Sequence, residues 1–327
     1  MSSLFTTLLP YFCILSLAAI AIIFTERAGI INLGINGVIV FGATTYMIFA
    51  YMIAPGSGPE MSPWLNIPLY IFAALGGILF LSLHGLISIK LKGNQVISGI
   101  ALNILAPALT LLILYLFGEA NAMPYNVGRL ELGNSANYEV ISIISFKTFI
   151  TLIIIIVAFV MFTFTRWGIR FKSVGENPQA ADSAGINVNR MKWKSIIISG
   201  ATAGIAGAIY ISEFSTGAAF KSQVTAEGLG FLAIAIVIIS RWRVLLSSLV
   251  AIVFGLLFAL GQQASNLFFN GNEIQPILMM LPYLITLLVL ILFSTPSLKF
   301  LSKLFNKMSG NVSGPKSLGQ PYDKSKR

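Results

Sequence analysis

The side chains best suited to chemistry in this sequence are uncharged polar groups that interrupt long apolar stretches. Asn and Gln side chains offer both hydrogen-bond donors and acceptors, and Ser adds a hydroxyl. Polar groups in a membrane-length apolar segment are costly, so each is a functional candidate. The candidates to line a solute pathway are Asn32, Asn36, Asn94, Gln95, Ser98 and Asn103. They suit an uncharged, hydrogen-bonding solute such as a nucleoside or a sugar. The alternative for each is a hydrogen bond between helices, worth about 0.6–2 kcal/mol.

The other reactive residues do not favour an enzyme. The sequence holds a single histidine, His84, and a single cysteine, Cys13, both within apolar stretches. One cysteine gives neither a disulfide framework nor a metal cluster within the chain. The phosphate-binding pattern GxxxxGK[ST] does not occur. We therefore expect no catalytic residues, no metal site and no cofactor bound by this chain. Two acids, Glu213 and Glu227, lie near the ends of apolar stretches, where water reaches.

The composition indicates a membrane protein. Hydrophobic residues make up 56% of the 327 residues and charged residues only 10%, whereas soluble domains carry about 25% charge. A soluble core of this size could not bury so much apolar surface. The net charge of +10 would suggest nucleic acid in a soluble protein, but here the basic residues are sorted by loop, so we expect no nucleic-acid partner.

The apolar runs predict an all-α, polytopic transmembrane bundle of about nine spans, because a helix needs about 20 residues to cross a bilayer. The predicted spans are 4–24, 30–53, 67–89, 96–117, 147–165, 195–213, 227–240, 243–264 and 276–295. Residues 1–296 would form the transmembrane domain, and 297–327 a basic, disordered tail. The spans 30–53 and 227–240 are polar at the start or short, so we expect broken or re-entrant helices there.

The basic residues predict the orientation of the chain. One set of connections carries most of the lysines and arginines, including those at 166–194, 241–243 and 299–327. The other set carries only Arg129, Lys147 and Lys221, together with most of the loop acids. Basic loops face the cytoplasm. We therefore expect a multi-pass protein of the cell membrane, with its N-terminus outside and its C-terminus inside.

The longest inner loop, 166–194, contains the pattern of a short docking helix. Asn177 is a good helix N-cap and Pro178 suits the first helical position. The Ala-rich segment from Pro178 would end at Gly185, a natural C-cap. Such a helix beneath the membrane would offer a partner a small rigid surface; the alternative is an ordinary solvated loop.

This loop also carries a resemblance to a known family. The segment 175–186 is similar to the coupling-helix region of ABC importer permeases for branched-chain amino acids, sugars and nucleosides. Further stretches resemble the family in the same order along the chain: 25–34, 93–103, 199–208, and 228–235 followed by Arg241-Trp242. The matches extend over about residues 20–262. The segment from Ile31 to Gly37 is most similar to the nucleoside-type branch, although Asn36 stands where that branch has an acidic residue.

The resemblance implies a type II-like importer domain and a set of partners. These are an ABC ATPase subunit that uses ATP and Mg, a second permease subunit, and an extracytoplasmic substrate-binding protein. The coupling helix would involve Gly175, Glu176, Asn177, Pro178, Ala180, Ala181, Ala184 and Gly185. A nucleoside is the expected solute. The alternatives are a simple sugar, a branched-chain amino acid, or a secondary active transporter driven by an ion gradient.

Overall fold

A computed structural model describes residues 2–56, 60–118, 123–128, 130, 145–214, 226–268, 278, 280–294 and 314–323. Apart from two isolated bridges, every regular element in these ranges is helical, as the sequence predicted. The elements are α1 Ser2–Arg27, α2 Ile35–Ile53, η1 Pro63–Leu65, α3 Asn66–Gly85, η2 Leu86–Lys90, α4 Gln95–Phe117, α6 Phe146–Phe164, α7 Arg166–Glu176, α8 Pro178–Ser183, α9 Val188–Phe214, η3 Ala226–Gly228, α10 Leu229–Ile239, α11 Val244–Phe268 and α13 Leu281–Ser294.

Seven stretches of the described chain are long and apolar enough to cross a membrane: Leu4–Arg27, Ile35–Ile53, Pro63–Lys90, Gln95–Phe117, Phe146–Phe164, Val188–Phe214 and Val244–Gln263. They correspond to seven of the nine predicted spans. The other two predictions, 227–240 and 276–295, fall on helices too short for this criterion: Ala226–Ile239 and the 14 residues of α13. The count of nine spans is therefore not confirmed.

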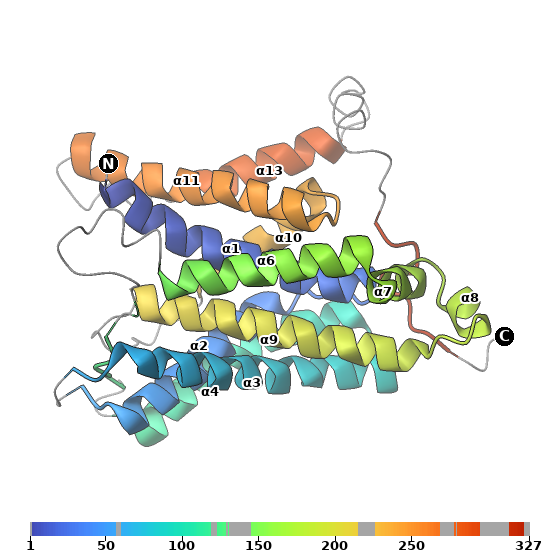
Figure 1. The fold of residues 1–327 in the computed structure, drawn as a ribbon, viewed down its shortest axis with the longest axis horizontal. Coiled ribbons are helices and arrows are strands. Elements are labelled where there is room, and N and C mark those ends of the chain that lie inside the picture. The colour runs from blue at the N-terminus through green and yellow to red at the C-terminus, as the bar shows by residue number, and fades with distance from the viewer. Residues whose placement is uncertain are drawn as a thin grey trace.

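The N-terminal helix α1 forms the centre of the bundle. From Cys13 to Ile23 its side chains are fully or almost fully buried, because α9, α10 and α11 pack around it. The helices run roughly along one long axis (Figure 1). The chain therefore surrounds its first span with helices from the second half of the sequence.

Close helix contacts depend on small residues. A Cβ on Gly77 of α3 would overlap the Gly200 carbonyl of α9, and one on Gly42 of α2 would lie 2.6 Å from the Gly204 Cα. The small-residue series of α9 thus lets α2 and α3 approach its backbone, as membrane helices commonly do. Gly200 and Gly204 therefore serve the packing of helices against one another.

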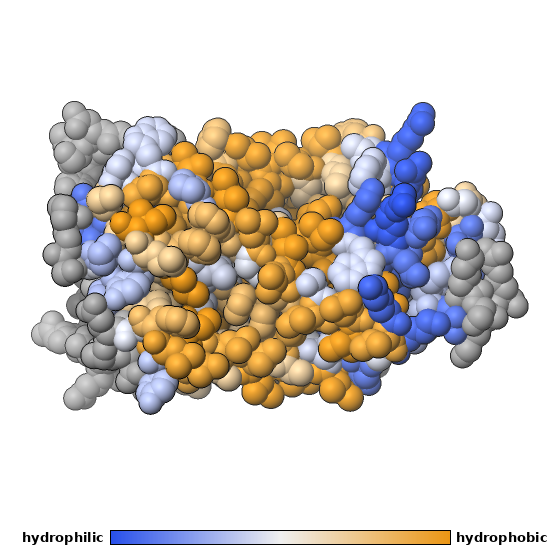
Figure 2. Space-filling view, turned by 90° about the horizontal axis from the view of Figure 1, so that it is seen from below, coloured by the Kyte–Doolittle hydropathy of each residue, from blue (hydrophilic) through white to orange (hydrophobic). Residues whose placement is uncertain are grey.

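The surface is divided into an apolar belt and a hydrophilic end. Figure 2 shows hydrophobic side chains over the middle of the molecule and hydrophilic ones gathered at the end that carries α7 and α8. Large apolar side chains are exposed in the belt, among them Ile104 at 70% and Leu79 at 63%. In water such a surface would aggregate, whereas lipid covers it without cost. We refer to the end with α7 and α8 as the basic end.

The two ends of the chain lie at opposite ends of the bundle (Figure 1). The start of α1 lies far from α8, and residues 314–323 lie beside α7 at the basic end. Of the predicted tail, 297–313 and 324–327 lie outside the described residues. Within 314–323, Pro315 and Ser317 are buried, and Asp323 forms an ion pair of 2.8 Å with Lys92.

Candidate functional site

The backbone between α1 and α2 is irregular from Ala28 to Gly34, and side chains of α3 and α4 bond to it. Gln95 Oε1 accepts a hydrogen bond of 2.8 Å from the Ile31 N–H. His84 lies 2.9 Å from the Ile31 carbonyl through Nε2 and 3.0 Å from the Ser98 hydroxyl through Nδ1. Because a carbonyl only accepts, Nε2 carries the proton. Both polar groups of Ile31 are therefore satisfied by side chains distant in sequence.

Asn103 serves the next part of the same segment. Its Nδ2 donates to the Leu33 carbonyl over 2.7 Å, and its Oδ1 accepts from the Gly37 N–H over 2.8 Å. Irregular backbone inside an apolar bundle requires such substitutes for missing backbone bonds. Asn103 thus holds the first turn of α2 against the middle of α4.

Asn36 joins the starts of α2 and α10. Its Oδ1 accepts a buried hydrogen bond of 3.0 Å from the Gly230 N–H. A Cβ on Gly230 would lie 2.5 Å from the Asn36 Cα, so only glycine permits this approach. The two residues are far apart in sequence, and their contact shows that two interrupted segments meet inside the bundle.

Two amides near α2 have an atom without a partner. Asn32 donates to the Ser199 hydroxyl over 3.3 Å, but its buried Oδ1 has no hydrogen-bond partner. The buried Nε2 of Gln95 also has none. Buried polar atoms are normally satisfied by protein or water, so these two atoms are open to a water or a solute group.

The structure thus brings five of the six predicted pathway residues to the start of α2. Asn94 differs, because it is exposed and caps α4 by accepting bonds from Val96 N (2.9 Å) and Ile97 N (3.2 Å). Contact of the six predicted pathway residues with a solute stays a prediction.

The start of α10 is built differently. Ala226, Glu227 and Gly228 all have left-handed backbone, with φ of 47°, 48° and 73°. The Tyr283 hydroxyl donates to the Glu227 carbonyl, and the Tyr11 hydroxyl donates to Glu227 Oε2 over 3.3 Å. The sequence placed Glu227 near the end of a span but not among the site residues. Its position beside Tyr11, near the middle of α1, is set by contacts that sequence spacing does not reveal.

The other acid, Glu213, forms a buried ion pair with Lys147. Their side chains are 2.7 Å apart and about 10% exposed. With Asn66, Tyr70 and Ser212 they line a small polar cavity between α3, α6 and α9. The sequence predicted that Glu213 would be accessible to water. It is instead buried in an ion pair with Lys147, which links α6 to α9.

The loop 166–194 forms the expected short helix. Asn177 Oδ1 accepts from the Ala180 N–H over 3.0 Å, Pro178 is the first helical residue, and α8 ends at Ser183 before Gly185 at φ +81°. Ala181 is buried, whereas Gln179, Ala180 and Ser183 are exposed. α8 therefore exposes one face and packs the other against the chain.

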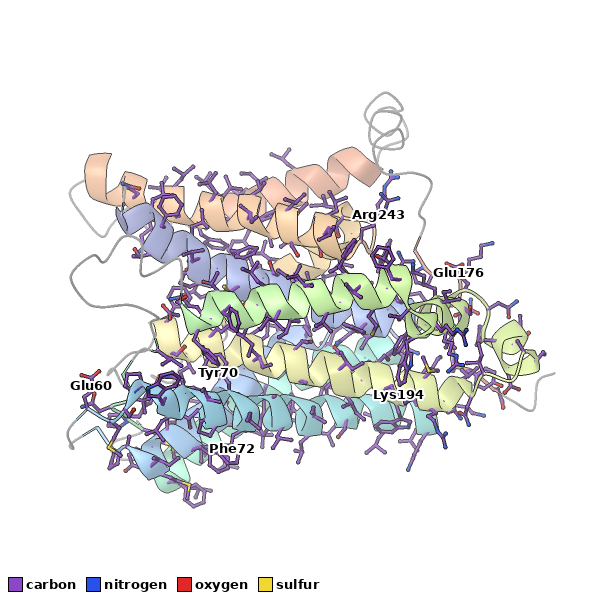
Figure 3. All side chains as sticks on the ribbon, in the orientation of Figure 1. Glu60, Tyr70, Phe72, Glu176, Lys194 and Arg243 are labelled. Atoms are coloured by element: carbon purple, nitrogen blue, oxygen red, sulfur yellow. The ribbon has the colours of Figure 1, made fainter. Side chains whose placement is uncertain are left out.

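The helix α7 attaches α8 to the bundle. A Cβ on Gly175 would overlap the Arg27 carbonyl, so α7 lies directly on the end of α1. Lys172 donates to the Phe162 carbonyl over 3.0 Å, and burial, followed by the nearby Arg27 charge, lowers the pKa of Lys172. Glu176, Lys194 and Arg243 lie at this basic end, whereas Glu60 and Tyr70 lie at the opposite one (Figure 3).

The segment 314–323 fills the angle between α7 and the α1–α2 connection. Ser317 donates through its backbone N–H to the Gly175 carbonyl over 3.0 Å, and Gly319 donates to the Gly29 carbonyl over 3.3 Å. Together with the start of α8 it borders a polar cleft, which is lined by Glu176, Asn177, Pro178, Gln179, Lys316, Ser317, Gln320, Pro321, Tyr322 and Asp323. One short segment thus joins the end of α7 to the α1–α2 connection.

Comparison with known proteins agrees with this architecture. Residues 4–292 match the family described as branched-chain amino acid transport system, permease component. The nucleoside ABC transporter permease protein NupC of Lactococcus lactis is 33% identical over 93% of this chain and 91% of its own length. The guanosine ABC transporter permease protein NupQ of Bacillus subtilis is 30% identical over 98% of this chain and 96% of its own. A metal-chelate-type ABC transporter in an inward-facing conformation has a similar fold, with a TM-score of 0.50, 16% identity, and coverage of 88% and 83% of the two chains.

Proposed function

The chain belongs to the branched-chain amino acid transport system permease family, and on that premise we propose that it is the permease subunit of an ABC importer for nucleosides. The resemblance found in the sequence is confirmed, including its nucleoside-type branch. The observation that carries the proposal is the full-length similarity to permeases named for nucleosides and guanosine. The uncharged amides and hydroxyls at the start of α2 support an uncharged solute.

The chain is a multi-pass membrane protein and a transport component. A second permease subunit and an ATPase subunit complete the transporter, and the ATPase binds and hydrolyses ATP with Mg. An extracytoplasmic binding protein delivers the nucleoside. The exposed face of α8, at the hydrophilic end of the bundle, supports its role as the coupling helix. Residues 175–185 dock in the ATPase, and its closure moves α7 and α8.

The basic end faces the cytoplasm and the N-terminus lies outside. The position of α8 opposite the start of α1 supports this orientation. In the proposed topology the short helices α10 and α13 complete nine crossings, and α2 and α10 are broken helices that begin within the bilayer. The unpartnered Asn32 Oδ1 and Gln95 Nε2 support a solute or water contact at the start of α2.

The experiment that tests this function is uptake into proteoliposomes that contain the assembled transporter. We expect ATP-dependent, binding-protein-dependent uptake of labelled guanosine, with little uptake of glucose or leucine. Preferred uptake of glucose or leucine would overturn the nucleoside assignment. Uptake that persists without the ATPase and follows an ion gradient would instead identify a secondary transporter.

A substitution tests the docking face. Ala180→Arg places a long charged side chain on the exposed face of α8, and we expect at least tenfold weaker binding of the ATPase subunit with proportional loss of uptake. Asn189→Arg, also exposed at the basic end but outside α8, is the control. Equal effects of the two variants would contradict the docking role.

A further inference from the structure

The carboxylate of Glu227 lies deep along the bundle. α10 runs beside α1, and Trp242 in the turn after α10 contacts both Glu26 (Trp242 Nε1 to Oε2, 2.5 Å) and Arg27 (Nη2 to the Trp242 carbonyl, 3.1 Å). The start of α10 instead contacts Tyr11 through Glu227. At 1.5 Å per residue, Tyr11 is about 24 Å from Arg27 and about 14 Å from Ser2 along α1. Glu227 therefore lies well inside the length of a membrane-spanning helix.

An acid at this depth is not explained by an ion pair. Among the described residues, the salt bridges are Lys92–Asp323 and Lys147–Glu213, and neither involves Glu227. Its side chain is also exposed rather than packed away. Ionisable groups in membrane segments are rare and mark substrate or ion pathways. Glu213 provides the contrast, because its carboxylate is buried and forms an ion pair with Lys147.

A cluster of aromatic rings lies around Tyr11, whose hydroxyl bonds to the carboxylate. Tyr11, which bonds to Glu227, stacks on Phe258 with ring centroids 4.3 Å apart and an interplanar angle of 6°. Phe258 lies edge-on to Tyr283 at 6.0 Å, and Phe214 lies 4.9 Å from Tyr11. Tyr210 extends the cluster through Phe214 at 5.4 Å. Rings with one polar tip suit a site that takes a flat, partly polar solute.

The backbone holds Glu227 in place at a cost. Left-handed conformation costs a residue with a Cβ about 1–2 kcal/mol, and Ala226 and Glu227 both adopt it. Such strain persists where the surroundings enforce it and is concentrated at ligand sites. Here the Tyr283 hydroxyl bonds to the Glu227 carbonyl and so fixes the turn from outside the helix.

We propose that Glu227 is a solute-recognition residue of the permease. Its carboxylate accepts paired hydrogen bonds from two neighbouring donors of the transported nucleoside, and the half-buried rings of Tyr210 and Tyr283 contact the flat base. Tyr11 is a positioning residue, because it bonds to one carboxylate oxygen. The inference rests on the proposed function, and it adds a specificity site that lies outside the amides at the start of α2.

Two parts of a nucleoside offer adjacent donors: the ribose diol, and the base edge of guanine with its ring N–H and amino group. The experiment distinguishes them by comparing guanosine with 2′-deoxyguanosine, which lacks one diol hydroxyl, and with inosine, which lacks the amino group. Uptake into proteoliposomes is measured with the complete transporter and saturating binding protein loaded with each nucleoside. Differences in affinity at the binding protein then do not enter the ratio.

We expect the unmodified transporter to take up guanosine at least tenfold faster than one of the two analogues, because a charged acceptor discriminates strongly against a missing donor. In Glu227→Gln that ratio should fall to about twofold or less, mainly through slower guanosine uptake. Tyr11→Phe should reduce the ratio partly. Glu60→Gln, an exposed carboxylate at the end of the molecule opposite the basic end, is the control and should leave both ratios unchanged.

Three results separate the outcomes. An unchanged ratio in Glu227→Gln, or an equal loss of uptake for all three nucleosides, overturns the recognition role. If Glu227→Gln does not assemble with the ATPase, Tyr11→Phe decides, and an unchanged ratio in that variant overturns the proposal. If the unmodified transporter takes up no nucleoside at all, the proposed function itself fails. That result is independent of the uptake ratios measured for Glu227→Gln.

Discussion

The starts of α2 and α10 are both interruptions of an apolar segment, yet they are held in opposite ways. At α2, side chains from neighbouring helices satisfy the open backbone: Gln95 and His84 bond to Ile31, and Asn103 bonds to Leu33 and Gly37. At α10 the backbone itself bends through left-handed residues, and the one acid there remains exposed. The difference shows that the role of a polar residue inside a span depends on its bonding partners.

The contact between the two starts should be the most sensitive point. In Gly230→Ala the new Cβ would lie 2.5 Å from the Asn36 backbone, so α2 and α10 must separate and their hydrogen bond is lost. We expect a loss of about 3 kcal/mol in the free energy of unfolding, measured by thermal unfolding of the purified chain in detergent. Gly255→Ala, whose Cβ meets nothing closer than 3.1 Å, is the control. Equal melting temperatures for the two variants would contradict the close approach.

Loss of the hydrogen bonds from Asn103 to α2 and its preceding segment should have the second-largest effect on stability. Asn103→Leu leaves the Leu33 carbonyl and the Gly37 N–H without their partner, and we expect a loss of about 2 kcal/mol, because unsatisfied buried groups keep their desolvation cost. Asn94→Ala removes only an exposed helix cap and should cost about 1 kcal/mol. The same unfolding measurement compares them. A smaller effect for Asn103 than for Asn94 would remove the distinction between supporting and capping amides.

A substitution at the start of α10 should raise the free energy of unfolding, whereas those at α2 lower it. Ala226→Gly relieves a left-handed alanine and should stabilise the chain by about 1 kcal/mol. Ala101→Gly, on an exposed turn inside α4, should destabilise it by about the same amount. If both substitutions destabilise, the left-handed turn before α10 is not a source of strain.

Several features were predictable because they depend on residues close together in sequence. Helix α8 follows from the cap at Asn177 and from Pro178, and its structure agrees to within a residue or two. The apolar runs likewise predicted each of the seven helices long enough to cross a membrane. The spans at 227–240 and 276–295 were less predictable, since short apolar helices are stabilised by packing that the local sequence does not describe.

The sequence by itself determined that this protein belongs in a membrane, which stretches are helical, and which segment offers a docking helix. Only the tertiary structure decided what each polar residue does. It paired Asn103 with Leu33, Asn36 with Gly230 and Tyr11 with Glu227. Hydropathy and capping act over a few neighbouring residues, whereas a buried amide or carboxylate takes its role from partners on other helices. Those partners are chosen by the packing of the whole bundle.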